Sequence, residues 1–303
     1  MTGIYTRYES PMPTSDLQRI RRHFDRAAET YAEAAVLHAE VERRVLERLD
    51  WIKIKPRRMV DIGCGPGRGT ALLQAKYPDA ECVAVDLSMA MLHQFRNKTP
   101  SRIKALSSLL PLRSRRFPLP VCADMSHLPL RDHCADLLYS GISLHWASDP
   151  RALFNEFRRV LRPGGLLMFT TVGPDTLKEL REAWTRVDND QTHVNRFPDL
   201  HDLGDALLSA GFKDPVTDME LFTLTYDDPL HVLRDLRAIG ADTVLTGYRD
   251  ALTGPKRLKA MTRAYRSLQV DGKVPSTWEI IYGSAWMGEA VAPGALPVAF
   301  QGL

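Results

Sequence analysis

Two stretches decide the fold: Val60-Asp61-Ile62-Gly63-Cys64-Gly65-Pro66-Gly67-Arg68-Gly69-Thr70 and, thirteen positions further on, Val83-Ala84-Val85-Asp86. Together they predict a buried strand, a glycine turn, a helix and a second strand that ends in an acid. Glycines let the backbone approach a ligand closely, and the carboxylate of Asp86 can accept hydrogen bonds from a ribose. The pattern is therefore typical of a nucleoside-binding site.

The glycine spacing separates three nucleotide-binding motifs. A P-loop needs a Lys before the final Ser or Thr, and Gly69-Thr70 has none, so nothing would hold the outer phosphates. A dinucleotide fingerprint needs a third small residue, but counting from Gly63 that position is Arg68, and counting from Gly65 it is Thr70. What remains is acid-x-Gly-x-Gly-x-Gly, which resembles the first motif of the class I S-adenosylmethionine (SAM) methyltransferases.

Composition limits the classes of protein that fit. The chain has 303 residues, of which 44% are hydrophobic and 25% charged, and its net charge of +3 is too small to argue for nucleic acid. No apolar run approaches about 18 residues, so no membrane span is expected. The cysteines lack metal-site spacing and are expected to be reduced thiols of a cytoplasmic protein. They are Cys64, Cys82, Cys122 and Cys134.

Short apolar strands alternate with helices, which predicts an α/β, Rossmann-like fold: a mostly parallel, seven-stranded sheet with helices on both faces. A helical segment precedes it, with apolar residues at three- and four-residue steps over 16–49. The turn Arg162-Pro163-Gly164-Gly165 is expected to end a helix before the fifth strand. Strands are expected at 58–62, 81–86, 120–124, 135–140, 166–172, 219–226 and 277–286. Helices are expected at 69–76, 89–97, 151–161, 175–187, 200–210, 229–239 and 255–268.

The domain organisation follows from this pattern. Residues 1–49 are expected to form a helical lid and 50–289 the main domain, with substrate-side helices within 173–215. The Ala-, Pro- and Gly-rich tail 290–303 is expected to be disordered. A basic insertion, 95–119, is either a solvated surface, which is the commoner case, or a docking patch for an acidic partner. The stretch from Gln94 to Ala123 contains no acid, and its basic residues are Arg96, Lys98, Arg102, Lys104, Arg113, Arg115 and Arg116.

Three acids end three successive strands, at the sheet edge where open α/β folds bind ligands. Asp86 suits the ribose of SAM, Asp124 with Met125 suits the adenine, and Asp61 with nearby carbonyls suits the ammonium group. Each acid alone could equally be a cap or a turn residue, but three together favour a ligand site. The expected cofactor-binding set is Asp61, Gly63, Gly65, Gly67, Asp86, Leu87, Asp124, Met125 and Ser140.

The segment after the fourth strand, Ser140–Trp146, should face the methyl acceptor. It lacks the Asn/Asp-Pro-Pro-Tyr string of enzymes that methylate nucleic-acid bases. His145 could act as a general base near neutral pH, although a structural histidine beside a wall-forming Trp146 is the favoured interpretation. Methyl transfer to a carboxylate needs no base, because that nucleophile is already ionised.

Several longer segments resemble the malonyl-acyl-carrier-protein O-methyltransferases of biotin synthesis, over about residues 20–283. The resemblance implies SAM as cofactor, the free carboxyl of a malonyl thioester as methyl acceptor, and an acidic acyl-carrier protein as partner. It makes Arg196 the candidate fork for that carboxylate and Tyr31 the candidate for closing over SAM, beside His145 and Trp146. The basic insertion and the tail are longer than the family pattern. The matching segments are 20–31, 86–92, 169–180, 193–197 and 236–241.

Other functions share parts of these motifs. Relatives that assemble respiratory complex I carry a similar fold associated with arginine hydroxylation, and they share segments such as 194–197 and 236–240. A methyltransferase for a small free carboxylic acid, such as trans-aconitate, would need no carrier-protein surface. A protein that only binds SAM is a weaker alternative. A nucleic-acid role would rest on the basic insertion alone, which has few interleaved aromatics, and is rejected.

Overall fold

The computed structural model describes residues 14–98, 117–242 and 254–288. The expected tail 290–303 and the insertion residues Arg102, Lys104, Arg113, Arg115 and Arg116 lie outside the described residues. Of the insertion, Arg96 is described as exposed on the helix that precedes the gap.

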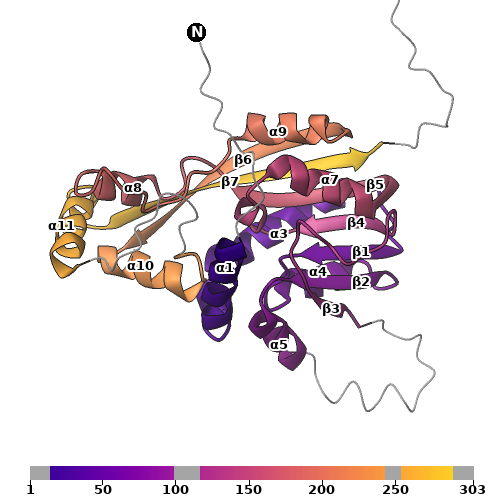
Figure 1. Ribbon diagram of the computed structural model, residues 1–303, viewed down its shortest axis with the longest axis horizontal. Helices are drawn as coiled ribbons and strands as arrows, with labels where there is room; N and C mark the ends of the chain where they lie inside the picture. The colour runs from indigo at the N-terminus through magenta and orange to yellow at the C-terminus, as the bar shows by residue number, and fades with distance from the viewer. Residues whose placement is uncertain (1–13, 99–116, 243–253, 289–303) are drawn as a thin grey trace, which may run out of the picture.

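The described strands form one seven-stranded sheet in the order β3-β2-β1-β4-β5-β7-β6 (Figure 1). The neighbours from β3 to β5 pair in parallel, and β7 runs antiparallel to both β5 and β6. The expected mostly parallel, seven-stranded sheet is therefore confirmed. The strands are β1 (Arg58–Ile62), β2 (Glu81–Asp86), β3 (Leu119–Cys122), β4 (Ala135–Ser140), β5 (Leu161–Val172), β6 (Phe212–Tyr226) and β7 (Val274–Met287).

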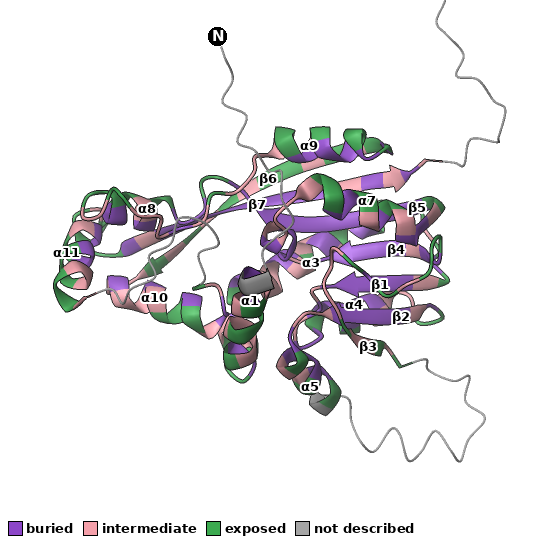
Figure 2. Ribbon diagram, viewed as in Figure 1, coloured by how far each residue is buried: buried purple, intermediate pink, exposed green. Residues whose placement is uncertain are grey.

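Helices cover both faces of the sheet, and the central strands are buried (Figure 2). The helices of the core unit are α4 (Arg68–Lys76), α5 (Met89–Lys98) and α7 (Pro150–Val160). Those of the later part are α8 (Lys178–Thr185), α9 (Leu200–Ser209), α10 (Pro229–Ala238) and α11 (Pro255–Arg266). One apolar core joins the first face to α4, α8, α10, α11 and the N-terminal helix α3 (Val36–Asp50), and a second joins the other face to α7 and α9.

The N-terminal segment is three helices where the sequence suggested one continuous pattern: α1 (Thr14–Ala27), α2 (Tyr31–Ala34) and α3 (Val36–Asp50). The break places α1 beside α5 and α10, while α3 packs along the sheet. Asp25 of α1 accepts hydrogen bonds from the Ser88 hydroxyl at 2.6 Å and from the Ala90 amide at 3.3 Å, at the start of α5. A carboxylate at a helix N-terminus is favourable, so this contact ties α1 to the sheet domain.

Two strands are longer than their apolar patterns predict. β5 begins at Leu161, before the expected turn at 162–165. Its register against β4 shifts between Ala135 and Leu137, so the residues expected to form the turn are an irregular part of the strand. β6 begins at Phe212, and exposed residues alternate with half-buried ones along most of it. Pairing with β7 along nearly its whole length extends β6 beyond the apolar run. Within the described ranges, no helix is long and apolar enough to cross a membrane.

Candidate active site

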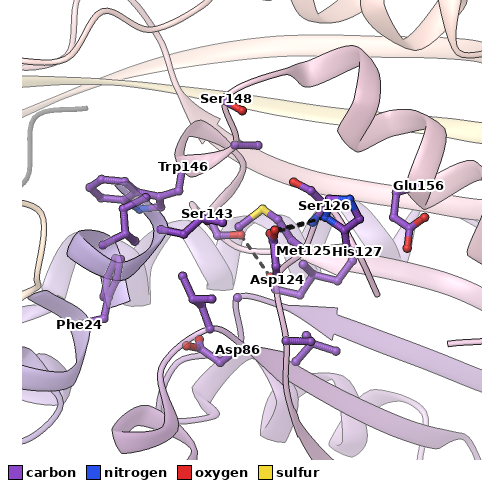
Figure 3. A pocket seen from close by; sticks show the side chains of 18 of the residues that line it. Phe24, Asp86, Asp124, Met125, Ser126, His127, Ser143, Trp146, Ser148 and Glu156 are labelled. Atoms are coloured by element: carbon purple, nitrogen blue, oxygen red, sulfur yellow. Dashed lines mark hydrogen bonds and ion pairs between the residues drawn. The ribbon is translucent and has the colours of Figure 1, made fainter. Parts of the chain in front are cut away.

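A cavity of about 720 Å³ lies at the carboxyl ends of β1, β2, β3 and β4, with α1 as its opposite wall (Figure 3). Residues from each strand end line it, as the fold predicts for an open α/β sheet. From α1, Leu17, Ile20 and Phe24 close the apolar side. Of the expected set, the cavity is lined by Gly63, Gly65, Asp86, Leu87, Asp124, Met125, Tyr31 and Trp146.

The turn after β1 can be built only with glycine at two points. Gly63 has a φ of 70°, and a Cβ there would stand 2.5 Å from the Cβ of Ser143. Gly67 has a φ of 85°, and a Cβ there would stand 1.9 Å from the ring of Phe95. The chain therefore passes close to the β4 loop and to α5 at this turn, which leaves its backbone open toward the cavity.

Asp86 holds this turn in place. One carboxylate oxygen accepts the Gly65 amide at 2.8 Å, and the other accepts the Ser88 amide at 2.7 Å. Burial raises the pKa of Asp86 to about 6, although the two backbone hydrogen bonds partly oppose this rise. The same carboxylate lines the cavity.

Asp124 and Met125 follow β3 on the next loop. A carboxylate oxygen of Asp124 accepts the Ser126 amide at 2.9 Å, which fixes the side chain, and Met125 offers an apolar surface beside it. Figure 3 shows Asp86 and Asp124 on neighbouring strand ends. The predicted pair of acids thus meets at one edge of the sheet.

A second cavity, of about 730 Å³, continues behind the glycine turn between α3 and α4. Tyr31 belongs to the walls of both cavities, and its ring would be 3.8 Å from a Cβ on Gly65. Burial, with Glu42 and Asp86 nearby, raises the pKa of Tyr31 far above its usual range, so its hydroxyl stays protonated. Gly67 lines this second cavity. Tyr31 therefore lies beside the glycine turn, and its closing over SAM stays a prediction.

Two more acids lie beneath the turn. Asp61 is buried and accepts the Thr70 hydroxyl at 2.5 Å, and Glu42 of α3 pairs with Arg68 at 3.0 Å. A Cβ on Gly69 would be within 3.4 Å of Glu42 Oε1 and 3.6 Å of Asp61 Oδ2, so the two carboxylates are close neighbours. Burial and their mutual repulsion raise the pKa of Glu42 to about 7, and burial raises that of Asp61 to about 7. The region is therefore strongly attractive to a cation.

Two residues of the expected cofactor set line neither cavity. Asp61 lies below the turn, where its carboxylate accepts the Thr70 hydroxyl. Ser140 is fully buried, and its hydroxyl donates to the Ile62 carbonyl at 3.0 Å and contacts Ser143 Oγ at 2.5 Å. The prediction that Ser140 lines the site is therefore corrected: the side chain that reaches the cavity is Ser143.

The loop after β4 carries backbone strain. Ile142 has a φ of 46°, a left-handed conformation that a β-branched residue rarely adopts. Its amide donates to the hydroxyl of Thr170 at 2.9 Å, which holds the conformation. Ile142 lines both cavities, so the strain lies at the site itself.

Aromatic rings form the wall at the acceptor side. Phe24 packs edge-on against Trp146 at 5.4 Å, and His145 lies between Trp146 at 4.9 Å and Phe197 at 5.6 Å. His145 lines neither cavity. Burial, with His38 nearby, lowers the pKa of His145 to about 3. The position of His145 behind the wall agrees with the favoured interpretation as a structural histidine.

Arg196 is exposed and lines neither cavity, so its role toward the acceptor stays a prediction. Its neighbour Phe197 joins the aromatic wall through His145. Arg181, whose guanidinium donates to the carbonyls of Thr176 at 2.9 Å and Asn195 at 3.5 Å, holds the chain on the inner side of this loop. Arg196 thus lies on the loop that contributes Phe197 to the aromatic wall.

Sequence reasoning missed Glu42, His38, Phe24 and Ser143. Glu42 and His38 flank the apolar row of α3, but nothing in a helical pattern distinguishes them from solvated residues. Within the described part of the chain, buried Tyr139 Oη, His38 Nδ1 and His145 Nδ1 lack hydrogen-bond partners. Such groups are costly unless something polar completes them. No three described His, Cys, Asp or Glu residues are grouped to hold a metal ion.

Comparisons with known proteins agree with this geometry. A family model described as a methyltransferase domain matches residues 60–169. The chain is 46% identical over 289 residues to the malonyl-[acyl-carrier protein] O-methyltransferase of Methylovorus sp. (strain MP688), covering 94% of this chain and 95% of that protein. It is also 46% identical over 274 residues to the enzyme of the same name from Laribacter hongkongensis (strain HLHK9), covering 90% of each.

Solved structures give the same fold. The YcgJ protein from Bacillus subtilis superposes with a TM-score of 0.56, covering 81% of this chain and 98% of that one. The two sequences are 14% identical, so this likeness concerns the fold alone.

Proposed function

We propose a function from the fact that this chain belongs to the malonyl-[acyl-carrier protein] O-methyltransferase family. In this proposal it transfers a methyl group from SAM to the free carboxylate of malonyl-acyl-carrier protein in biotin synthesis. The observation that carries the proposal is the extent of the similarity. It covers the N-terminal helices and the elements after β5, both of which lie outside the general methyltransferase domain at 60–169.

The cavity residues fit SAM. In this proposal Asp86 accepts hydrogen bonds from the ribose hydroxyls, and Asp124 with Met125 binds the adenine amine and ring; all three residues line the cavity. The second cavity, with Tyr31 above and Glu42 below, suits the amino-acid end of the cofactor. The carboxyl groups of Asp86 and Glu42, which line the first and the second cavity, support a cationic occupant. Bound SAM supplies an electrophilic methyl group on a positively charged sulfur.

The residues of the chain then have three tasks. The aromatic wall of Phe24 and Trp146 excludes water, and the glycine turn and Tyr31 fix the orientation of the methyl group. No proton need be removed from a malonyl carboxylate, which agrees with the weak basicity of His145. The acids hold the cationic cofactor more tightly than its neutral product, so their field also favours product release.

The same acids repel an incoming carboxylate, so the acceptor requires a cation. Among the described residues that line the two cavities, the cations are Arg68, paired with Glu42, and Arg159, paired with Glu156 at 2.7 Å and Asp132 at 2.6 Å. Arg196 is exposed on the loop beside the wall and remains our candidate for binding the malonyl carboxylate. This role requires the loop to turn Arg196 toward the acceptor.

A direct assay tests the proposal. The protein is incubated with methyl-labelled SAM and malonyl-acyl-carrier protein, and the product is examined for a base-labile methyl ester by mass spectrometry. The expected result is one methyl group per malonyl group and none on acetyl-acyl-carrier protein, which lacks the free carboxyl. Parallel reactions contain an arginine peptide or trans-aconitate. An absent ester together with hydroxylated peptide, or with methylated trans-aconitate, would replace the proposal by that activity.

A further inference from the structure

Helix α11 has a one-sided charge composition. Its twelve residues include Lys256, Arg257, Lys259, Arg263 and Arg266, and neither Asp nor Glu. No role in binding SAM accounts for this pattern, because none of these residues lines either cavity.

The helix has a buried and an exposed face. Met261, Thr262 and Tyr265 are buried toward the core, and the Tyr265 hydroxyl donates to the Pro275 carbonyl at 2.9 Å. On the other face, exposed basic residues are spaced by three, four and three positions, which aligns them along one row. The row is Lys256, Lys259, Arg263 and Arg266.

Acids neutralise only part of this charge. Arg266 pairs with Asp228, and Arg257 pairs with Asp188 at 3.0 Å. Within the described ranges, no ion pair is formed by Lys256, Lys259 or Arg263, which we call the α11 stripe.

The α11 stripe costs folding stability. Lys256 and Lys259 place positive charge in the first turns of a helix, where the helix dipole favours negative charge. Like charges three and four residues apart on a helix also repel one another. A surface of opposite charge would offset both terms. The stripe is therefore better suited to a bound partner than to the free protein.

The position of α11 favours a partner connected with the acceptor. The helix lies outside the general methyltransferase domain at 60–169 but inside the region shared with the malonyl-[acyl-carrier protein] O-methyltransferases. It packs on α8 and α10, and α10 packs on α1 and α2, which carry Phe24 and Tyr31 (Figure 1). Two helix-to-helix steps of about 8–10 Å each therefore separate the stripe from the cavity wall.

We infer that the α11 stripe is the docking surface for an acidic face of the acyl-carrier protein. The inference rests on the proposed function, because that function makes a protein, and not a small acid, the carrier of the acceptor. A docked carrier would present its acyl group on a flexible arm long enough to pass α10 and reach the aromatic wall. Complementary charge would chiefly raise the rate and affinity of this encounter.

The test reverses the three charges, with the substitutions Lys256→Glu, Lys259→Glu and Arg263→Glu, and compares two substrates. One is malonyl-acyl-carrier protein, and the other is malonyl-coenzyme A, which has the same acyl thioester but no carrier protein. The expected result is a KM for malonyl-acyl-carrier protein at least about tenfold higher, with weaker dependence on salt. Turnover of malonyl-coenzyme A and the dissociation constant for SAM should be unchanged.

A matched control carries the same change of charge at the opposite edge of the sheet. Lys53, Lys55 and Arg57 are exposed just before β1, at the amino ends of the strands. Reversal of these three to Glu should leave KM for malonyl-acyl-carrier protein within about twofold of the wild type, because they lie away from α11. An equal rise in KM for this control would mean that net charge alone matters, and would overturn the assignment.

Two further outcomes would overturn the inference. One is an unchanged KM for malonyl-acyl-carrier protein in the stripe variant. If that variant also fails to co-sediment with anionic lipid vesicles that bind the wild type, the stripe binds a lipid surface instead. The other is an equal loss with malonyl-coenzyme A, which would indicate damage to the site. If the wild-type protein fails to methylate malonyl-acyl-carrier protein at all, the proposed function fails instead, and the two failures are thereby distinguished.

Discussion

Asp86 combines a structural task and a binding task in one carboxylate. It accepts the Gly65 and Ser88 amides, so it fixes the glycine turn, and it lines the cavity. Asp86→Ala should weaken SAM binding by about 100-fold or more, because hydrogen bonds to a charged group contribute roughly 1.5–3 kcal/mol each. Isothermal titration calorimetry measures the effect.

The Asp86→Asn variant separates the two tasks, since an amide keeps one acceptor oxygen and should lose less affinity than Asp86→Ala. Circular dichroism serves as the control for folding. Wild-type affinity in a folded Asp86→Ala protein would exclude the ribose role.

Arg196 offers a second test at this scale. Arg196→Ala should leave SAM affinity unchanged, because the side chain is outside both cavities, and should lower kcat/KM for malonyl-acyl-carrier protein by about tenfold or more if it binds the carboxylate. Arg196→Lys should recover only part of this loss, since Lys lacks the planar fork. Steady-state kinetics measure the effect. If kcat/KM for malonyl-acyl-carrier protein is equal in the wild type and in Arg196→Ala, then Arg196 does not bind the carboxylate.

The sequence predicted those residues whose position follows from neighbours along the chain. Asp86, Asp124 and the glycines stand at strand ends, and a strand end is readable from a short apolar run followed by an acid or a glycine. Glu42 and Ser143 were missed because their importance depends on contacts across the fold. Glu42 reaches Asp61 only after α3 packs beside α4, and Ser143 reaches the cavity only because Ser140 turns inward.

At the scale of elements, the docking of α1 closes the apolar side of the cavity. Asp25→Ala would remove the carboxylate that accepts from Ser88 and Ala90 at the start of α5. Loss of such a contact costs about 1 kcal/mol, so we expect a fall in Tm of a few degrees and a severalfold weaker SAM affinity through faster release. Stopped-flow release of SAM and hydrogen exchange measure these effects.

The same experiment has an internal control. Asp16→Ala, on the same helix, removes an ion pair with Arg19 at 3.1 Å that stays within α1, so it should leave exchange in α5 unchanged. If hydrogen exchange in α1 and α5 is the same in Asp25→Ala as in the wild type, then the Asp25 carboxylate does not hold the two helices together.

The order of elements was readable from sequence, whereas their lengths were less so. Alternation of short apolar runs with helical patterns identified every strand of the sheet. The N-terminal half of β6 was missed because alternate residues such as Asp218 and Val216 face solvent, so pairing with β7 rather than hydrophobicity defines the strand there. The break between α1 and α3 was hidden because its residues continue the helical spacing.

At the scale of the whole molecule, buried acids couple stability to pH. Asp86, Asp61 and Glu42 have pKa values raised to about 6, 7 and 7 in the folded chain, so the folded state holds protons that the unfolded chain releases near pH 4. Their contribution to stability is complete below about pH 4 and is lost as pH rises through 6–7. Each group then removes up to about 1.4 kcal/mol per pH unit.

Cofactor binding should show the opposite trend. SAM is cationic at its sulfur and its ammonium group, so the increase in Tm caused by saturating SAM should grow from pH 5.5 to pH 8. Glu42→Gln should flatten this dependence, raise the Tm of the cofactor-free protein at pH 8 and weaken SAM binding. Differential scanning fluorimetry across this range checks all three. If the increase in Tm caused by SAM is the same at every pH, then SAM binding does not depend on the protonation state of these acids.

The outer part of β7 has a consequence for the reach of the acceptor. β7 spans 14 residues, about 46 Å at 3.3 Å per residue, and it pairs with β6 along nearly its whole length but with β5 only over 280–286. Residues 274–279 therefore extend past the last β5 partner as a two-stranded ribbon with β6, and α8 and α11 lie at this end of the sheet (Figure 1). A carrier protein docked on the α11 stripe would need a tether that spans this ribbon, about 20 Å for six residues.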